Sequence, residues 1–206
     1  MTTTPRDLLI VAIDLAIDLT SGGTVGQGDL SLALAGAELL DLVDAEAVDL
    51  DGDRIVPGMP RTMDDRLLDE AVSSLIRVAP HESVEDWLWR RGRGLLARYL
   101  TVLEEEGKLA HRRHRWNFLS SGRTEMADSP DRQHAVERWT SREPVLVGLA
   151  AAVGIDGKQA ESPEGFTDDA VGTVLAVVGD AVTELAAVRQ RRGIEDAAFD
   201  NVWRGL

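Results

Sequence analysis

A short segment of the sequence concentrates side chains that could bind a phosphate group. Guanidinium groups form paired hydrogen bonds with phosphate oxygens, and an indole ring places an apolar body and a polar edge at the depth of lipid headgroups. Both residue types occur together within residues 87–98, as Trp87, Trp89, Arg90, Arg91, Arg93 and Arg98. We therefore take the arginines of this segment as candidate ligands of an anionic headgroup.

A second basic and aromatic cluster follows after one predicted helix. Turn-prone residues come directly after it, so we expect residues 109–126 to form a β-hairpin. Such a hairpin could dip an indole ring into the interface of a membrane. The candidate residues of this hairpin are Arg112, Arg113, Arg115, Trp116, Phe118 and Leu119.

The first cluster also has a purely structural interpretation. Trp87 could be a core residue, and the arginines around it could form salt bridges with Glu104, Glu105 and Glu106. Arginine-carboxylate pairs are common within folded domains, so residue types alone leave both interpretations open.

The remaining polar motifs do not predict a metal site or a catalytic centre. His111 and His114 lie three residues apart, but arginines flank them and no carboxylate lies nearby. The segment DLDGDRI lacks the closing glutamate of a calcium loop, and no GK[ST] motif follows the glycines near residue 26. No arrangement of serine, histidine and acid is recognisable either. We therefore expect no metal, no cofactor and no enzymatic activity.

The net charge of −14 is unevenly distributed along the chain. Residues 81–146 carry 12 basic and 11 acidic residues, whereas residues 1–80 carry 5 basic and 15 acidic ones. Screening confines exposed charges to a range of roughly 8 Å at physiological salt, so a basic patch can act locally on an acidic protein. This distribution favours a small anionic partner and makes nucleic acid an unexpected one.

Cysteine is absent, and this excludes disulfide bonds and thiolate chemistry. The apolar stretch at 170–178 is shorter than the roughly 18 residues of a membrane span, and the amino terminus does not resemble a secretory signal. We therefore expect a cytoplasmic protein that is peripheral on the inner face of the membrane.

Helical patterns dominate the elements that must position these residues. Gly92 and Gly94 are expected to interrupt one helical region, and Gly193 is expected to end the last long helix before a short amphipathic piece. The expected helices begin near residues 5, 29 and 64 and span 83–107, 130–139, 144–153 and 168–192.

Strands are expected to be few and short. Alternating apolar and acidic residues at 13–19 predict a strand, and the sequence AVDLDGDRIV at 47–56 predicts a hairpin around Asp51 and Gly52. Residues 154–166 have the composition of a flexible linker before the C-terminal helices. The sequence thus predicts a mainly α fold: a single domain over 1–206 with a helix-bundle core and short β-hairpins.

The order of these segments resembles the Golgi phosphoprotein 3 family, which also has bacterial members. The matching pieces include DLLIVAIDL, RTMDDRLLDEAVSSL, EDWLW and LEEEGKLAHRRHRWNFL, and the resemblance covers nearly the whole chain. A preference of 20 arginines to 2 lysines indicates a GC-rich bacterial genome, such as that of an actinobacterium. The resemblance implies a single, mainly helical domain.

The resemblance also implies a function and a site. Eukaryotic members bind phosphatidylinositol 4-phosphate at the membrane and retain Golgi enzymes, using a pocket of one tryptophan and three arginines. Arg93 matches one of these arginines, whereas Gly26, Ala35 and Leu96 occupy the other positions. The chain is thus expected to bind that lipid or a bacterial anionic lipid. The hairpin at 109–126 matches the element associated with self-association and implies a homo-oligomer.

Two other functions fit parts of the sequence. A helix ending in LEEEGKL before a basic hairpin is also typical of a winged-helix DNA-binding domain, although its glutamates would face backbone phosphates. A protein-interaction module without lipid binding is the third alternative.

Overall fold

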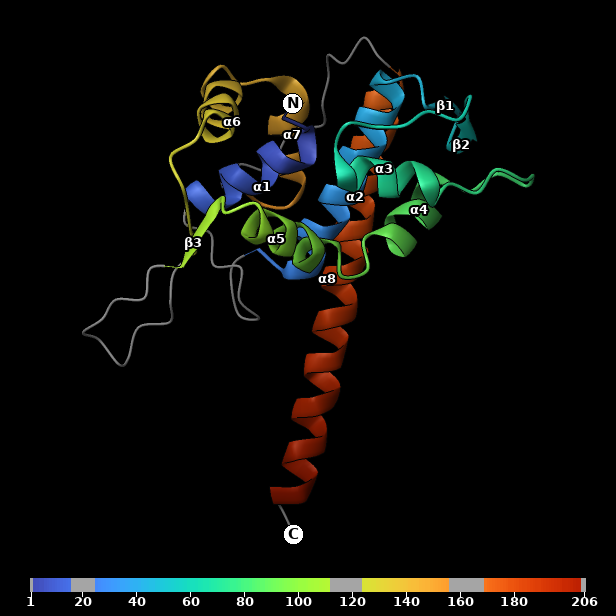
Figure 1. The fold of residues 1–206 in the computed structure, drawn as a ribbon. Coiled ribbons are helices and arrows are strands. Elements are labelled where there is room, and N and C mark those ends of the chain that lie inside the picture. Colours follow the sequence, from blue (N-terminus) through green and yellow to red (C-terminus); the bar gives the residue numbers. More distant parts are fainter. Residues whose placement is uncertain (1, 16–24, 112–123, 156–168, 205–206) are drawn as a thin grey trace.

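Helix α2 (Gln27–Asp44) lies at the centre of the fold, and most of the other helices pack around it (Figure 1). The computed structural model describes residues 2–15, 25–111, 124–155 and 169–204. Apolar residues occur on nearly every face of α2, so most of its length is buried. This arrangement confirms the prediction of a mainly α fold with a helix-bundle core.

Helix α1 (Thr4–Asp14) is also a core element, since every residue from Thr4 to Ile13 is buried. Pro5 lies in its first turn, where the missing N–H costs nothing. The predicted strand at 13–19 is wrong where it can be checked, because Ile13 and Asp14 belong to this helix. The rest of that segment lies outside the described residues.

The predicted hairpin at 47–56 is confirmed. Strands β1 (Val48–Asp51) and β2 (Arg54–Pro57) pair in antiparallel register, with Asp51 opposite Arg54. Gly52 in the turn has a φ of +62°, a conformation that glycine adopts without strain.

Helix α3 (Arg66–Ser73) follows the hairpin. The Asp65 side chain accepts hydrogen bonds from the backbone N–H groups of Leu67 and Leu68 and so caps the helix. Its amphipathic character places Leu67 and Leu68 in the core.

Helices α4 (Val84–Arg91) and α5 (Leu95–Glu105) confirm the predicted break at the two glycines. Gly94 has a φ of +68°, and a Cβ at Gly92 would lie 2.6 Å from the carbonyl oxygen of Leu88. Both positions therefore favour glycine. The turn between the two helices presents Arg93 at the surface.

Strands β3 (Leu109–His111) and β4 (Thr124–Met126) pair in antiparallel register and confirm the base of the second predicted hairpin. Its connecting residues 112–123 lie outside the described part. Helices α6 (Pro130–Thr140) and α7 (Pro144–Ala152) follow as predicted. Residues 156–168, which contain most of the predicted linker, are not described.

Helix α8 (Asp169–Arg204) is one continuous helix, so the prediction that Gly193 ends it is wrong. Its first half packs beside α2, and its second half projects from the body (Figure 1). The two helices approach closely at Gly36, where a Cβ would lie 2.6 Å from Cγ2 of Val178. A glycine inside a helix costs only about 1 kcal/mol relative to alanine, so Gly193 does not stop the helix by itself.

Part of α8 has the length and composition of a membrane span, contrary to the expectation from the short apolar stretch at 170–178. Among the described residues, the segment Asp169–Glu195 is long and apolar enough to cross a bilayer. An 18-residue window within it has a mean hydropathy of 1.7. Val174, Val178 and Ala181 of this segment are buried against the body. This face of α8 therefore belongs to the core of the domain.

Candidate functional site

Three of the four predicted headgroup arginines have carboxylate partners. Arg91 is the most buried of them: its Nε lies 2.7 Å from Oε2 of Glu38, and it also donates to the carbonyl oxygen of Leu67. The Tyr99 hydroxyl donates to the same carboxylate at 3.0 Å. Burial raises the pKa of Glu38, while the nearby Arg91 opposes this rise. Arg91 therefore compensates a buried charge inside the fold.

Arg90 and Arg98 are paired nearer the surface. The Nε of Arg90 lies 2.6 Å from Oε1 of Glu82, and its guanidinium lies 5.2 Å from the ring centroid of Trp87. Nη2 of Arg98 lies 2.6 Å from Oε1 of Glu70. These two arginines hold neighbouring elements together, as Arg91 does.

The purely structural interpretation of this cluster is confirmed for Trp87, which is a core residue. The salt bridges that it predicted for the arginines form with other carboxylates. Trp87 is fully buried, and its indole N–H donates to the carbonyl oxygen of Ala35 at 3.0 Å. The glutamates at the end of α5 pair elsewhere: Glu105 with Arg66, and Glu106 with Arg6 and Lys108. Pairings between residues so far apart in the sequence cannot be deduced from spacing.

Arg93 differs from the other three arginines. It is exposed, and no carboxylate of the described residues forms an ion pair with it. Its guanidinium is therefore available for an external anion.

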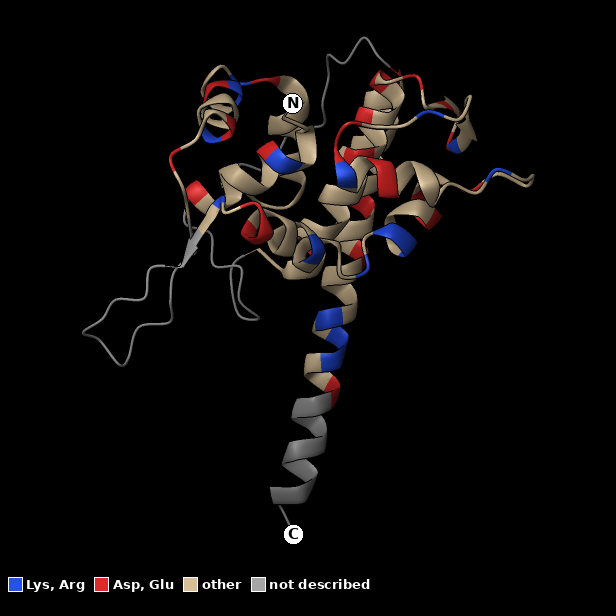
Figure 2. Ribbon diagram, viewed as in Figure 1, with Lys and Arg blue, Asp and Glu red and all other residues tan. Residues whose placement is uncertain are grey.

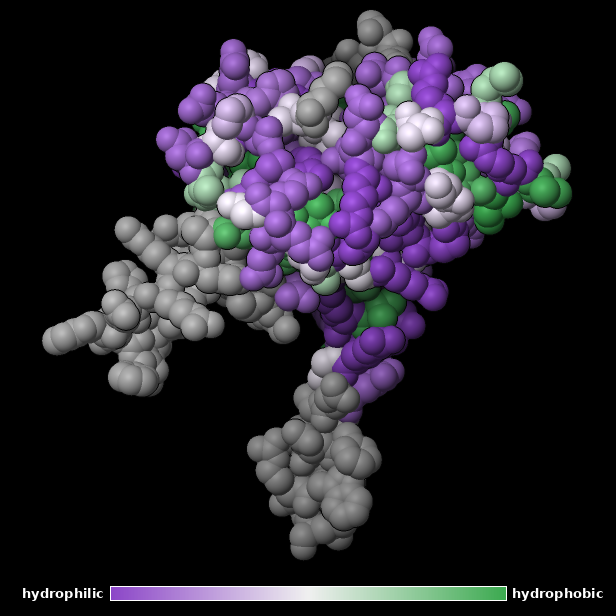
Figure 3. Space-filling model, in the orientation of Figure 1, coloured by the Kyte–Doolittle hydropathy of each residue, from purple (hydrophilic) through white to green (hydrophobic). Residues whose placement is uncertain are grey.

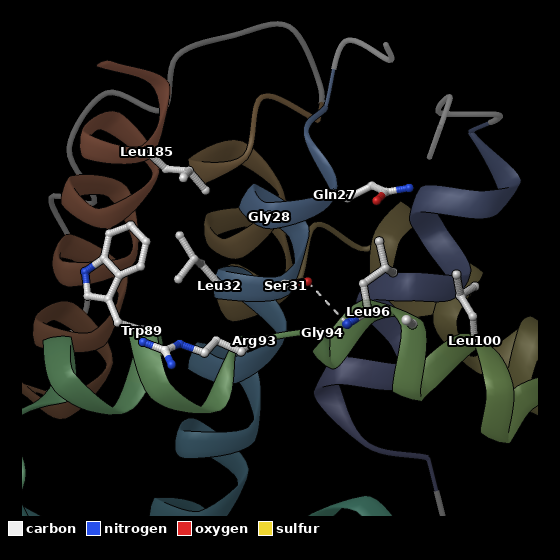
Figure 4. A pocket seen from close by; sticks show the side chains of 12 residues that line it. Gln27, Gly28, Ser31, Leu32, Trp89, Arg93, Gly94, Leu96, Leu100 and Leu185 are labelled. Atoms are coloured by element: carbon white, nitrogen blue, oxygen red, sulfur yellow. Dashed lines mark hydrogen bonds between the residues drawn. The ribbon is translucent and has the colours of Figure 1, made fainter. Parts of the chain in front are cut away.

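Arg93 lies at the edge of a pocket of about 350 Å³. The start of α2, the turn between α4 and α5, and helix α8 together form its walls, and Trp89 and Arg93 lie along one side (Figure 4). The wall is otherwise largely apolar, with Leu32, Leu96 and Leu185 among its residues. Such a pocket suits a ligand with one charged group and an apolar part.

The pocket brings together some positions that the resemblance assigns to headgroup binding. Arg93 and Leu96 line it, and Gly26 caps α2 beside it. Ala35 is instead buried on α2 and is not among the residues that line the pocket. Of the family's charged and aromatic positions, only Arg93 contributes a charged side chain here.

Sequence reasoning missed the contributions of α2 and α8 to this pocket. The sequence predicts a helix that begins near residue 29, but α2 begins at Gln27, and Gly28 in its first turn lines the pocket. A Cβ at Gly28 would lie 2.7 Å from Cδ2 of Leu185 on α8. Two glycines spaced by one residue before an apolar helix were the available signal of a close approach.

Several candidate residues lie outside the described part of the chain. They are those of the second cluster: Arg112, Arg113, Arg115, Trp116, Phe118 and Leu119. Self-association through the hairpin at 109–126 therefore stays a prediction. Among the side chains that the structure describes, no group of three or more histidines and acids could hold a metal ion.

Comparison with known proteins shows the family of the chain. The model of the family described as Golgi phosphoprotein 3 (GPP34) matches residues 5–192. None of the curated proteins matches the chain. Because the family match extends from the first turn of α1 to the exposed part of α8, it includes every element that forms the pocket. The chain belongs to the Golgi phosphoprotein 3 family.

Proposed function

We propose that this protein is a non-enzymatic, peripheral membrane protein that binds the headgroup of an anionic phospholipid in the pocket beside Arg93. The observation that carries the proposal is the contrast between Arg93 and its neighbours. Arg90, Arg91 and Arg98 each contact a carboxylate, whereas Arg93 is exposed at the edge of a pocket. The family membership is compatible with this function.

The lining of the pocket supports binding without catalysis. Among its residues Arg93 is the only one with a charged side chain, and Ser31 is the only hydroxyl. Ser31 accepts a hydrogen bond from the backbone N–H of Leu96 at 3.3 Å. Among the described residues, no histidine or carboxylate lines the pocket to act as a general base on this hydroxyl.

The charge of the whole protein limits the strength of this binding. One basic residue near an anionic surface contributes about 1 kcal/mol, and the surrounding acidic residues repel the same surface. Figure 2 shows acidic residues on most elements of the body. We therefore propose weak, reversible binding on the cytoplasmic face of the membrane.

Sedimentation with vesicles tests this function. Wild-type protein should bind phosphatidylcholine vesicles that contain phosphatidylglycerol and should not bind vesicles of phosphatidylcholine alone. Arg93→Ala should weaken binding about fivefold, because it removes roughly 1 kcal/mol of attraction.

Arg54→Ala is the matched control, since it removes one exposed arginine from the β2 strand, outside the pocket. It should bind like the wild type. Equal losses in both variants, or equal binding to neutral vesicles, would contradict the assignment of the pocket.

A further inference from the structure

Helix α8 places a second guanidinium next to the pocket. Nη1 of Arg189 lies 2.7 Å from Oδ2 of Asp29, and the same oxygen accepts a hydrogen bond from the backbone N–H of Gly26 at 3.1 Å. The Arg189 side chain is 42% exposed, whereas that of Asp29 is 11% exposed. Arg189 is therefore anchored at one nitrogen, and its side chain stays partly exposed.

This guanidinium lies across the two glycines at the start of α2. A Cβ at Gly26 would lie 2.6 Å from Nη1 of Arg189, and a Cβ at Gly28 would lie 2.9 Å from Nη2. Gly28 itself lines the pocket. The glycines thus leave space for an arginine that comes from a distant part of the chain.

The same contacts leave no room for a side chain at position 26 unless the ends of the Asp29 and Arg189 side chains shift. A Cβ there would lie 2.5 Å from Oδ2 of Asp29, closer than carbon and oxygen approach without a bond. The tryptophan that the resemblance associates with this position could be accommodated only if the pair of Asp29 and Arg189 moved away. The pocket of this chain therefore recognises its ligand with a different set of groups.

The charges of these groups favour a ligand with a single negative charge. Arg93 and Arg189 are cations, and Asp29 cancels one of the two charges. A phosphodiester carries one negative charge, whereas a phosphorylated inositol adds about 1.5 to 2 further charges on its phosphomonoester. Extra negative charge without a partner is costly at a partly desolvated site.

The apolar wall points to the same class of ligand. Leu32, Leu96, Leu100 and Leu185 are among the residues that line the pocket, and they suit a glycerol backbone and the first carbons of acyl chains. The leucines offer no hydrogen-bonding partner for the several hydroxyl groups of an inositol ring, and the polar side chains of the lining are those of Gln27, Ser31, Trp89 and Arg93.

We propose that the pocket takes the singly charged phosphodiester of a phosphatidylglycerol-type phospholipid, with Arg93 and Arg189 donating to it from two sides. This inference rests on the proposed function, which assigns lipid binding to the same pocket. It adds Arg189 and Asp29 as residues that determine the specificity.

The test compares two sets of vesicles matched for total surface charge, one with phosphatidylglycerol and one with phosphatidylinositol 4-phosphate. Wild type should bind the first set several-fold more tightly. Arg189→Ala should weaken binding to the first set about fivefold, as expected for the loss of one cation. Arg192→Ala, which removes an exposed arginine one turn further along α8, is the control and should have a smaller effect.

Asp29→Asn distinguishes a role in ligand specificity from a purely structural role of the ion pair between Asp29 and Arg189. Removal of the carboxylate charge should tighten binding to the phosphoinositide vesicles and reduce the preference for phosphatidylglycerol. Circular dichroism on each variant would check that the fold is retained. Addition of inorganic phosphate distinguishes a phospholipid from a free anion: it should not displace the protein from the vesicles if the apolar wall contributes.

The possible failures are distinguishable. If Arg189→Ala behaves like Arg192→Ala while Arg93→Ala still loses binding, the inference is wrong and the proposed function stands. A wild-type preference for the phosphoinositide vesicles would also overturn the inference. If the wild type binds neither set, both proposals fail.

Discussion

At the scale of single residues, the structure separates arginines that the sequence presents as equivalent. Arg91 and Arg93 are two positions apart, yet one contacts buried Glu38 and the other is exposed at a pocket. Residue type and local spacing predicted a phosphate-binding cluster, and only part of that cluster is available for it. The partners Glu38, Glu70 and Glu82 come from other elements, and nothing in the local sequence indicates them.

A buried carboxylate near the amino terminus gives a testable pH dependence. Burial raises the pKa of Asp41 to about 6, and the hydrogen bond that its carboxylate accepts from the backbone N–H of Thr4 at 2.8 Å opposes this rise. The folded state thus binds a proton more tightly than the unfolded state, so the free energy of unfolding should fall as the pH rises from about 4 to about 6.

Asp41→Asn should remove this dependence and stabilise the protein at pH 7 by at most about 3 kcal/mol, since Asn keeps an acceptor for the Thr4 N–H. Urea unfolding of both proteins at pH 5 and pH 7 measures the effect. A variant that is less stable than the wild type at pH 7 would show that the ionised carboxylate stabilises the fold.

Glu106 has the opposite dependence and serves as an internal comparison. Its bond with Arg6 lowers its pKa to about 2, so its stabilising contribution is present above about pH 4.5 and is lost as the pH falls towards 2. These two groups together should therefore give a stability maximum at about pH 4, with a decline on both sides of it.

At the scale of elements, close contact between α2 and α8 holds the pocket together. Gly36→Ala would place a Cβ 2.6 Å from Cγ2 of Val178 and should destabilise the protein by about 1–3 kcal/mol. Gly179→Ala is the matched control, because a Cβ there meets no atom within 4 Å. It should be neutral or stabilising by up to about 1 kcal/mol. Thermal unfolding measures both, and equal effects would contradict the close crossing.

The sequence predicted elements well where local chemistry decides the conformation. The hairpin around Gly52 and the break at Gly92 and Gly94 depend on backbone conformations or contacts that favour glycine, and both are confirmed. The predictions failed where tertiary packing decides. Ile13 and Asp14 alternate like a strand but continue a helix whose every face is buried. The continuation of α8 past Gly193 likewise could not be inferred from one glycine.

At the scale of the whole molecule, the distribution of charge limits the kinds of partner. A net charge of −14 opposes extended contact with a nucleic acid or an anionic membrane. Arg90, Arg91 and Arg98 would have to leave carboxylate partners to contact DNA phosphates, which argues against the winged-helix alternative. The face drawn in Figure 3 is mainly hydrophilic with small apolar patches.

Several exposed basic residues lie close to the pocket. Arg189, Arg191 and Arg192 form a basic band on α8 just beyond the body, as Figure 2 shows, and Arg93 faces the pocket that α8 helps to form. A local contact at this end of the molecule keeps most acidic elements away from the lipid surface. This placement reconciles an acidic protein with an anionic ligand.

The most direct test of the pocket is to locate a bound lipid by amide NMR. Titration with a short-chain phosphatidylglycerol should shift the amide signals of Gly28, Gly92, Gly94 and Leu96, which line the pocket. The same titration of Arg93→Ala should require several-fold more lipid for these shifts. If the shifts instead occur around the groove formed by Thr3, Asp41 and Met63, or if no signal of the pocket moves, the headgroup site assigned here is wrong.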